Sequence, residues 1–236
     1  MITVRALLFD TIGTLLDWRG GLIAQLHTWG AAHDLTADWA SLVDAWRLDF
    51  VMSIAKVRTG ERRWANQDQL QRESITKLAP QHGIPELHDV ALDELVRMWH
   101  QLPPWPDTTA ALEKLRTRYV IAPLSNSHVA MLIDLARTAG FTCDAVLGAD
   151  IFRQYKPDPT IYFGAAAFLG CQPTEVMLVA SHPSDLDAAA ACGLRTCYVS
   201  RPLEYGAGRI VEPTPEPGHF DLMVGDLLEL AKLTDC

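Results

Sequence analysis

Polar side chains stand where apolar runs end, and two of them suit nucleophilic chemistry. Asp10 follows the largely apolar run 4–9, and Lys156 lies in the segment 155–159, which reads Tyr-Lys-Pro-Asp-Pro. A carboxylate is a weak nucleophile, and a nearby cation helps it to stay ionised in a closed pocket. Each residue alone has a plainer interpretation. An Asp after a strand usually caps a helix or forms a turn, and a Lys before Pro usually lies in a solvated loop.

Two further segments supply polar groups in the same way. Ser125 and Asn126 follow one apolar run, and Asp185 closes a polar segment that follows another. The carboxyl ends of parallel strands meet at one edge of a sheet, where ligands bind in open α/β folds. We therefore expect these residues to converge with Asp10 and Lys156. The convergence of four segments outweighs the plainer interpretation of each one.

The elements that would position these residues alternate between strand and helix. Apolar runs predict strands at 4–9, 119–124, 145–147, 176–180, 196–199 and 220–224. Helices fit between them at 108–117, 129–139, 160–169 and 185–192. This alternation predicts an α/β fold with a doubly wound, Rossmann-like parallel sheet and right-handed crossovers.

The segment between the first two predicted strands differs in character, because residues 17–100 show only helical patterns. Apolar residues follow helical spacing over 39–54, and a second helical stretch ends before Pro80. Six of the seven tryptophans lie between Trp18 and Trp99 and can build an aromatic-walled lid. We predict a catalytic core of residues 1–16 and 101–236, with a helical cap of residues 17–100. The site would lie between them.

Composition narrows the class of protein. The 236 residues are 49% hydrophobic, and the net charge of -9 is not gathered in blocks, which argues against nucleic acid and anionic membrane surfaces as partners. No apolar stretch reaches membrane-spanning length, and Asp10 interrupts the first one too early for a signal peptide. Five cysteines without a close pair favour a reduced, cytoplasmic protein. The eight histidines show no zinc-binding spacing, so a structural metal is not expected.

Together these motifs resemble the haloacid dehalogenase superfamily over nearly the whole chain. The resemblance rests on the opening 10–15 (Asp-Thr-Ile-Gly-Thr-Leu), the Ser-Asn pair at 125–126, the Lys-Pro-Asp-Pro at 156–159 and the acidic loop that contains Asp185. It implies that Asp10 is the nucleophile and that Lys156 steadies its charge. It also implies a homodimer.

The superfamily contains Mg²⁺-dependent phosphotransferases and a smaller dehalogenase branch, and two positions discriminate between them. The phosphatases carry a second Asp two residues after the nucleophile, where this chain has Ile12. They carry another at the position of Ser181. Asp10 and Asp185 could still anchor Mg²⁺. The two replacements nevertheless favour chemistry without metal, cofactor or phosphate.

The cap and the later loops resemble those of type II (L-2-)haloacid dehalogenases. Trp46-Arg47-Leu48 is similar to a segment whose arginine reaches the departing halide, and Tyr162 matches a dehalogenase position. Tyr162 is an equally good candidate for an aromatic residue that packs against the sheet. The loop departs from the better known members at His182, where they have Asn. His182 is either a packed histidine or a donor beside the halide.

The resemblance implies a mechanism for a small anionic haloacid. Ser125 and the backbone amides of Thr11 and Ile12 would hold the substrate carboxylate, and Asp10 would attack the halogen-bearing carbon to form an ester. The remaining roles are as follows: Arg47 and Asn126 stabilise the halide, Thr14 hydrogen-bonds Asp10, Asp185 directs water to the ester, and Tyr162 and His182 contact substrate or halide. A Mg²⁺-dependent phosphatase and a non-catalytic relative are the alternatives.

Overall fold

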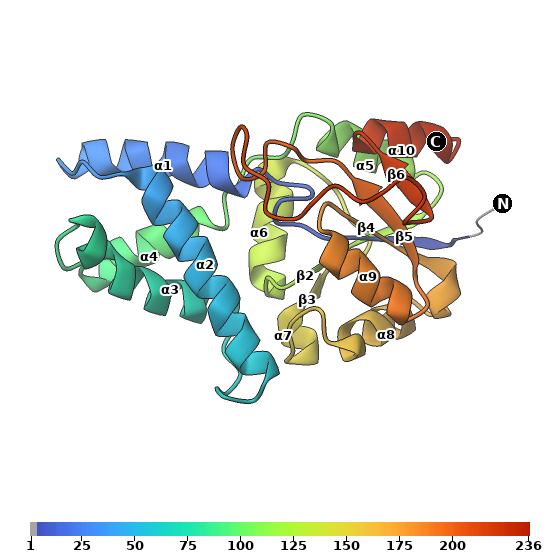
Figure 1. Cartoon of the computed structure of the whole chain (residues 1–236), viewed down its shortest axis with the longest axis horizontal. Helices are drawn as coiled ribbons and strands as arrows, with labels where there is room; N and C mark the ends of the chain where they lie inside the picture. The colour runs from blue at the N-terminus through green and yellow to red at the C-terminus, as the bar shows by residue number, and fades with distance from the viewer. Residues whose placement is uncertain (1–3) are drawn as a thin grey trace.

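The computed structural model describes residues 4–236, and a six-stranded parallel sheet forms its centre (Figure 1). The strand order is β3-β2-β1-β4-β5-β6, and every neighbouring pair is parallel. The strands are β1 (Ala6–Phe9), β2 (Val120–Ser125), β3 (Leu147–Gly148), β4 (Val176–Ala180), β5 (Arg195–Val199) and β6 (Leu222–Val224). Leu7 of β1 lies between Ile121 and Met177 in register, so the first strand occupies the middle of the sheet.

Helices cover both faces of the sheet, which is why β1 and β4 are buried along their whole length and show no apolar–polar alternation. These helices are α5 (Thr108–Leu115), α6 (Val129–Ala139), α7 (Ala149–Phe152), α8 (Pro159–Phe168), α9 (Pro183–Ala191) and α10 (Leu227–Leu233). Side chains of α5, α6 and α10 pack with Leu7 and Phe9, whereas side chains of α8 and α9 pack with Ala6 and Leu8. The two apolar layers confirm the predicted doubly wound fold.

A helical region lies beside the sheet, at the left of Figure 1. It comprises α1 (Trp18–Ala32), α2 (Trp39–Arg58), α3 (Gln67–Leu78), the 3₁₀ turn η1 (Ala79–His82) and α4 (Asp89–Met98), and we call it the cap. Asp17, Asp38 and Asn66 accept hydrogen bonds from the first turns of α1, α2 and α3, which explains where these helices begin. The division of the chain at residues 17 and 100 stays a prediction.

The tryptophans mostly build the inside of the cap. Trp18 and Trp99 stack with ring centroids 6.3 Å apart, and Trp46 meets the ring of Trp99 edge-on at 5.5 Å. Trp29 and Trp39 are buried in the same apolar cluster. These side chains therefore belong to the apolar core of the cap and do not form an exposed surface.

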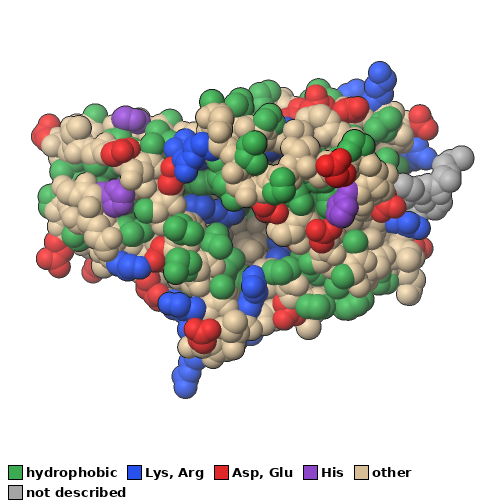
Figure 2. Space-filling model, viewed as in Figure 1, with side chains coloured by type: hydrophobic (Ala, Val, Ile, Leu, Met, Phe, Trp, Pro, Cys, Tyr) green, Lys and Arg blue, Asp and Glu red, His purple; other side chains and the backbone are tan. Residues whose placement is uncertain are grey.

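The two segments that join the cap to the core run beside each other. The amide of Asp17 donates to the carbonyl of Pro103 at 2.9 Å, and the amide of Trp105 donates to the carbonyl of Leu15 at 3.0 Å. The cap thus leaves and rejoins the core at one place. On the face in Figure 2, basic and acidic side chains are interspersed. Within residues 4–236 no helix is long and apolar enough to cross a membrane.

Candidate active site

A cavity of about 590 Å³ lies between the cap and the carboxyl ends of the central strands. Asp10 reaches it from the end of β1, Ser125 from the end of β2, and Lys156 from the loop before α8. Most of the site residues predicted from the sequence line this cavity: Asp10, Ile12, Arg47, Ser125, Asn126, Lys156, His182 and Asp185.

Asp10 is buried, and both of its carboxylate oxygens accept hydrogen bonds. Lys156 Nζ donates to Oδ1 at 2.8 Å, while Thr14 Oγ1 and His182 Nδ1 lie 2.7 and 3.1 Å from Oδ2. Burial by itself would raise the pKa of Asp10, but the charges of Lys156 and His182 outweigh it and hold the pKa below its usual value. Asp10 is therefore an anion at neutral pH.

Lys156 joins two carboxylates. Its ammonium group donates to Asp10 at 2.8 Å and to Asp185 Oδ2 at 2.5 Å, and the side chain is 6% exposed. Burial would lower the pKa of Lys156, but the two carboxylates outweigh it and raise the pKa. The side-chain oxygen of Asn126 accepts from the Lys156 amide at 2.7 Å and so fixes the backbone that carries the cation.

Asp185 stands in the first turn of α9, and its second oxygen has a partner that differs from the sequence-based expectation. The hydroxyl of Tyr162, on α8, donates to Asp185 Oδ1 at 2.5 Å. Burial first, and then the charge of Asp185, raise the pKa of Tyr162, which keeps the phenol protonated as a donor. The sequence left two interpretations of Tyr162 open, a contact with substrate or halide and an aromatic residue packed against the sheet, and its place in the apolar layer with Leu8 agrees with the second. Its ring is fully buried, and its hydroxyl orients Asp185 from the side away from the cavity.

His182 bridges two carboxylates, which neither of the two interpretations from the sequence anticipated. Its Nδ1 bonds to Asp10, and its Nε2 lies 2.9 Å from Glu204 Oε1. Burial would lower the pKa of His182, but Glu204 and Asp10 outweigh it and raise the pKa well above its usual value. Each ring nitrogen faces an acceptor, so the ring is an imidazolium.

Glu204 is a component of the site that the sequence did not reveal. It is 3% exposed, and it also accepts from Trp18 Nε1 at 3.1 Å and from Ser181 Oγ at 3.3 Å. Burial would raise its pKa, but the charge of His182 lowers the pKa below its usual value. The carboxylate therefore links the loop after β5 to both the cap and the strand-end residues.

Gly13 makes room for this carboxylate. Its φ of +95° lies in the left-handed region, and a Cβ atom added there would lie 2.1 Å from Glu204 Oε1. Gly13 was the one signal in the sequence for a close neighbour at this turn. The sequence did not indicate which residue fills the space, because Glu204 lies in an irregular loop.

The cap contributes a cation to the cavity. The guanidinium carbon of Arg47 lies 5.4 Å from the ring centroid of Trp18 and 5.8 Å from that of Phe50. Within residues 4–236, no carboxylate lies within 4.0 Å of its nitrogens. Arg47 is partly buried, and a guanidinium beside aromatic rings at the wall of a cavity can bind an anion.

Small polar groups surround Asp10 on the core side. Ser125 Oγ accepts from the amide of Ser127 at 3.2 Å and donates to its hydroxyl at 3.3 Å. Thr11 is fully buried, and its hydroxyl has no hydrogen-bond partner among the described residues. Ile12 is 5% exposed and presents an apolar surface to the cavity, where a second carboxylate would be needed to protonate a phosphate ester's leaving group.

The arrangement fits Mg²⁺ poorly. A magnesium ion would have to sit between Asp10 and Asp185, but Lys156 Nζ already bridges these carboxylates. The other oxygen of Asp185 faces Tyr162. Ser181, at the position where the phosphatases carry an acidic ligand, shares a hydrogen bond with Thr14 at 3.1 Å. The positive charge next to Asp10 in this structure comes from Lys156 and His182.

Comparison with known proteins places the chain in a family. The family model of haloacid dehalogenase-like hydrolases matches residues 4–193. The chain belongs to this family. It is 31% identical to (S)-2-haloacid dehalogenase 4A of Burkholderia cepacia over 209 residues, which cover 86% of this chain and 87% of that protein. It is 25% identical to the phosphoglycolate phosphatase of Mesorhizobium japonicum (strain LMG 29417 / CECT 9101 / MAFF 303099), with 94% of each chain covered.

Solved structures agree with this placement. The crystal structure of the L-2-haloacid dehalogenase PA0810 superimposes with a TM-score of 0.94 at 42% identity, covering 98% of this chain and 99% of the other. The defluorinating L-2-haloacid dehalogenase Rha0230 gives a TM-score of 0.93 at 40% identity, covering 99% and 96%. The resemblance inferred from the sequence motifs is thereby confirmed.

Proposed function

We propose that this protein is a hydrolytic dehalogenase that converts short 2-haloalkanoates, such as haloacetates and 2-halopropionates, to 2-hydroxy acids and halide, without a metal. One observation carries the proposal. Asp10 is a buried anion held by Lys156 and His182, and it shares a cavity with the Arg47 cation and the apolar side chain of Ile12. Related enzymes named as haloacid dehalogenases support the same chemistry.

In the first step, Asp10 displaces the halide. Ser125 and the amides of Thr11 and Ile12 hold the substrate carboxylate, so that the halogen points towards Arg47 and Asn126. An Asp10 oxygen attacks C2 in line, the C–O bond forms as the carbon–halogen bond breaks, and C2 inverts. Arg47 stabilises the negative charge that develops on the departing halide.

The contacts of Asp10 suggest which oxygen attacks. Oδ2 accepts from Thr14 and His182, whereas Oδ1 accepts only from Lys156 among the described residues. Oδ1 is thus the less restrained nucleophile, and Oδ2 becomes the carbonyl oxygen of the ester. When water attacks the ester, negative charge returns to Oδ2, where the Thr14 hydroxyl and the His182 imidazolium already stand as donors.

In the second step, Asp185 takes a proton from water, which attacks the carbonyl carbon of the Asp10 ester. The ester C–O bond breaks at that carbon, and the departing alkoxide takes back the proton that Asp185 removed from water. The 2-hydroxy acid leaves with the original Asp10 oxygen, and Asp10 loses its proton to solvent and returns to the carboxylate. Tyr162 keeps Asp185 oriented, and Lys156 balances the charge of both carboxylates. The cap limits access of bulk water during the displacement.

Halide release tests the proposal directly. Chloro-, bromo- and fluoroacetate are supplied to the wild type and to Asp10→Asn, with and without EDTA. We expect halide from the wild type in both conditions and none from Asp10→Asn. A single turnover in oxygen-18 water should give an unlabelled 2-hydroxy acid, because the first product oxygen comes from Asp10; a labelled product would reject the ester.

The phosphatase alternative predicts a different pattern. Turnover of phosphoglycolate that is lost with EDTA and restored by Mg²⁺, together with no halide release, would favour it. An intact fold without either activity would favour a non-catalytic relative.

We also propose a homodimer, from the family resemblance, and a cytoplasmic location, from the five cysteines without a close pair. Because most of the cap tryptophans are buried, a cap interface would use exposed apolar side chains such as Leu48 and Met52 of α2. Light scattering of the purified chain tests the dimer, and cell fractionation tests the location.

A further inference from the structure

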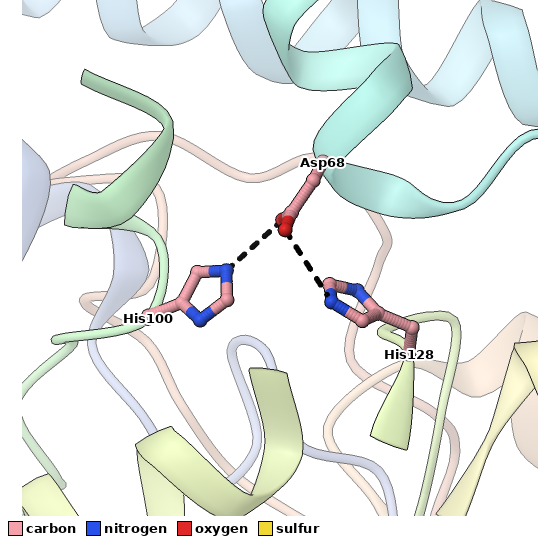
Figure 3. Close-up of side chains that lie close together, drawn as sticks. All are labelled: Asp68, His100 and His128. Carbon is pink, nitrogen blue, oxygen red and sulfur yellow. Dashed lines mark hydrogen bonds and ion pairs between the residues drawn. The ribbon is translucent and has the colours of Figure 1, made fainter. Parts of the chain in front are cut away.

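A second group of ionisable side chains lies where the cap meets the core, apart from the residues around Asp10. Asp68 stands in the first turn of α3, His100 follows α4, and His128 precedes α6 (Figure 3). Both histidines are buried, and Asp68 is partly buried. In Figure 3 a nitrogen of each ring points to the carboxylate of Asp68, and the two rings lie on the same side of it.

The spacing of the three groups suits a small metal ion. His100 Nε2 lies 3.0 Å from Asp68 Oδ1, and His128 Nε2 lies 3.4 Å from Asp68 Oδ2. One ligand atom of each residue lies within 4.8 Å of the others. Tetrahedral zinc holds nitrogen and oxygen ligands at about 2.0–2.1 Å, which separates neighbouring ligand atoms by roughly 3.3 Å. Each of the two contacts goes to a different Asp68 oxygen, and the ligand atoms of the group lie within 4.8 Å of one another. Small side-chain shifts would therefore bring one oxygen and both nitrogens to that separation.

A carboxylate contacts the ring nitrogen of His100 that faces away from Asp68, as is common for histidines that bind metals. Its Nδ1 lies 2.8 Å from Asp134 Oδ2, on α6. A carboxylate that accepts from one ring nitrogen fixes the tautomer and turns the other nitrogen towards the metal. Here that other nitrogen, Nε2, points to Asp68.

A proton is the competing occupant. Burial would lower the pKa of His100, but Asp68 and Asp134 outweigh it and raise the pKa, so an imidazolium could join the two carboxylates. This alternative leaves His128 Nε2 at a long contact of 3.4 Å from Asp68, with no proton shared between the two. A cation accounts for the inward turn of both rings.

We propose that Asp68, His100 and His128 form a binding site for a divalent transition metal, Zn²⁺, with water as the fourth ligand. This proposal differs from the sequence-based expectation of no structural metal. No motif spacing reveals the three residues, because 32 residues separate Asp68 from His100. The metal would fasten α3 of the cap to the start of α6 in the core, and it takes no part in the chemistry at Asp10.

Zinc titration of the untagged full chain tests the proposal. The EDTA-treated, dialysed protein is titrated with ZnCl₂ in a calorimeter at neutral pH. We expect one site per chain in the wild type and at least a tenfold loss of affinity in Asp68→Asn and in His128→Gln. His219→Gln is the matched control, because His219 lies 2.9 Å from Asp187 in an exposed His–Asp pair. It should bind zinc like the wild type.

Cobalt gives a second measurement that does not depend on comparing affinities. Co²⁺ in a four-coordinate site with histidine ligands should give strong visible absorption in the wild type, which Asp68→Asn loses while its circular dichroism stays native. No saturable zinc binding, equal binding in all variants, or loss in His219→Gln alone would overturn the proposal. Halide release is measured separately, so a failed zinc site leaves the dehalogenase proposal standing, and the reverse also holds.

Discussion

Replacing Lys156 by Met should destabilise the fold strongly, because the change leaves two carboxylates buried without their shared cation. Lys156 Nζ lies 2.8 Å from Asp10 Oδ1 and 2.5 Å from Asp185 Oδ2. Met has a similar length and fills the space. Removing one partner of a buried ion pair typically costs about 3–5 kcal/mol, because the other charge stays desolvated.

The magnitude follows from opposing contributions. At an effective dielectric constant of about 20, unit charges 2.8 Å apart attract by about 6 kcal/mol, and burying each ion offsets several kcal/mol of this. For a chain of this size, 1 kcal/mol shifts the melting temperature by roughly 2–4 °C, so Lys156→Met should melt about 6–20 °C below the wild type.

The sign of the pH dependence is also fixed. Without Lys156, burial raises the pKa of Asp10 with less opposition, so the variant favours a protonated Asp10. The deficit in unfolding free energy should therefore shrink as the pH falls towards the carboxylate range, near the ordinary Asp pKa of about 3.9. Halide release should be lost at all pH values.

Urea unfolding followed by tryptophan fluorescence, at several pH values, measures this prediction. Lys114→Met is the control, because Lys114 is exposed on α5. The double variant Lys156→Met with Asp185→Asn should recover part of the stability. If Lys156→Met were as stable as Lys114→Met at neutral pH, the assignment of Lys156 as the partner of two buried anions would be refuted.

Three further changes test the rest of the site. Gly13→Ala should lower the free energy of unfolding by about 1–3 kcal/mol or more, because the added Cβ atom meets Glu204 on a backbone in the left-handed region. An unchanged midpoint of urea unfolding would contradict the close contact between Gly13 and Glu204. Tyr162→Phe removes the hydrogen bond to Asp185, which is worth about 1.5–3 kcal/mol, and should slow ester hydrolysis roughly 10- to 150-fold. The Asp10 ester should then accumulate and be detected by mass spectrometry. If it does not accumulate, Tyr162 does not have this role. His182→Asn should lower the free energy of unfolding most below about pH 6.5, and less as the pH rises through the raised pKa of His182, because the imidazolium pairs exist only while the ring is protonated. Urea unfolding at several pH values measures this loss of stability. A loss that does not depend on pH would show that His182 is neutral.

The sequence predicted those parts of the molecule that local pattern determines. Buried parallel strands read as unbroken apolar runs, so the positions of β1 and β4 could be predicted, and with them the strand-end placement of Asp10 and Ser181. The start of α10 was missed, because the predicted strand at 220–224 was the last element recognised.

Contacts between distant segments could not be predicted. Glu204 lies in an irregular loop after β5, where no periodicity constrains its side chain, yet it holds His182. Tyr162 sits on a helix whose pattern indicates which face is buried, but not that its hydroxyl reaches Asp185. Such pairings are chosen by how helices and loops pack around the sheet, and that choice leaves no spacing in the sequence.

The paired linkers beneath the cap have a consequence for how such a protein can change. Because a backbone hydrogen bond joins Asp17 and Pro103, the cap is an insertion in the chain whose two ends lie next to each other. A segment of that kind can be lengthened, remodelled or exchanged without shifting a strand of the sheet. Arg47 and the apolar cap residues that line the cavity belong to this insertion, whereas Asp10, Lys156 and Asp185 belong to the core that contains the sheet. If the proposed function holds, substrate range and bond-breaking chemistry belong to separate parts of one chain, and selection can alter the first while it preserves the second.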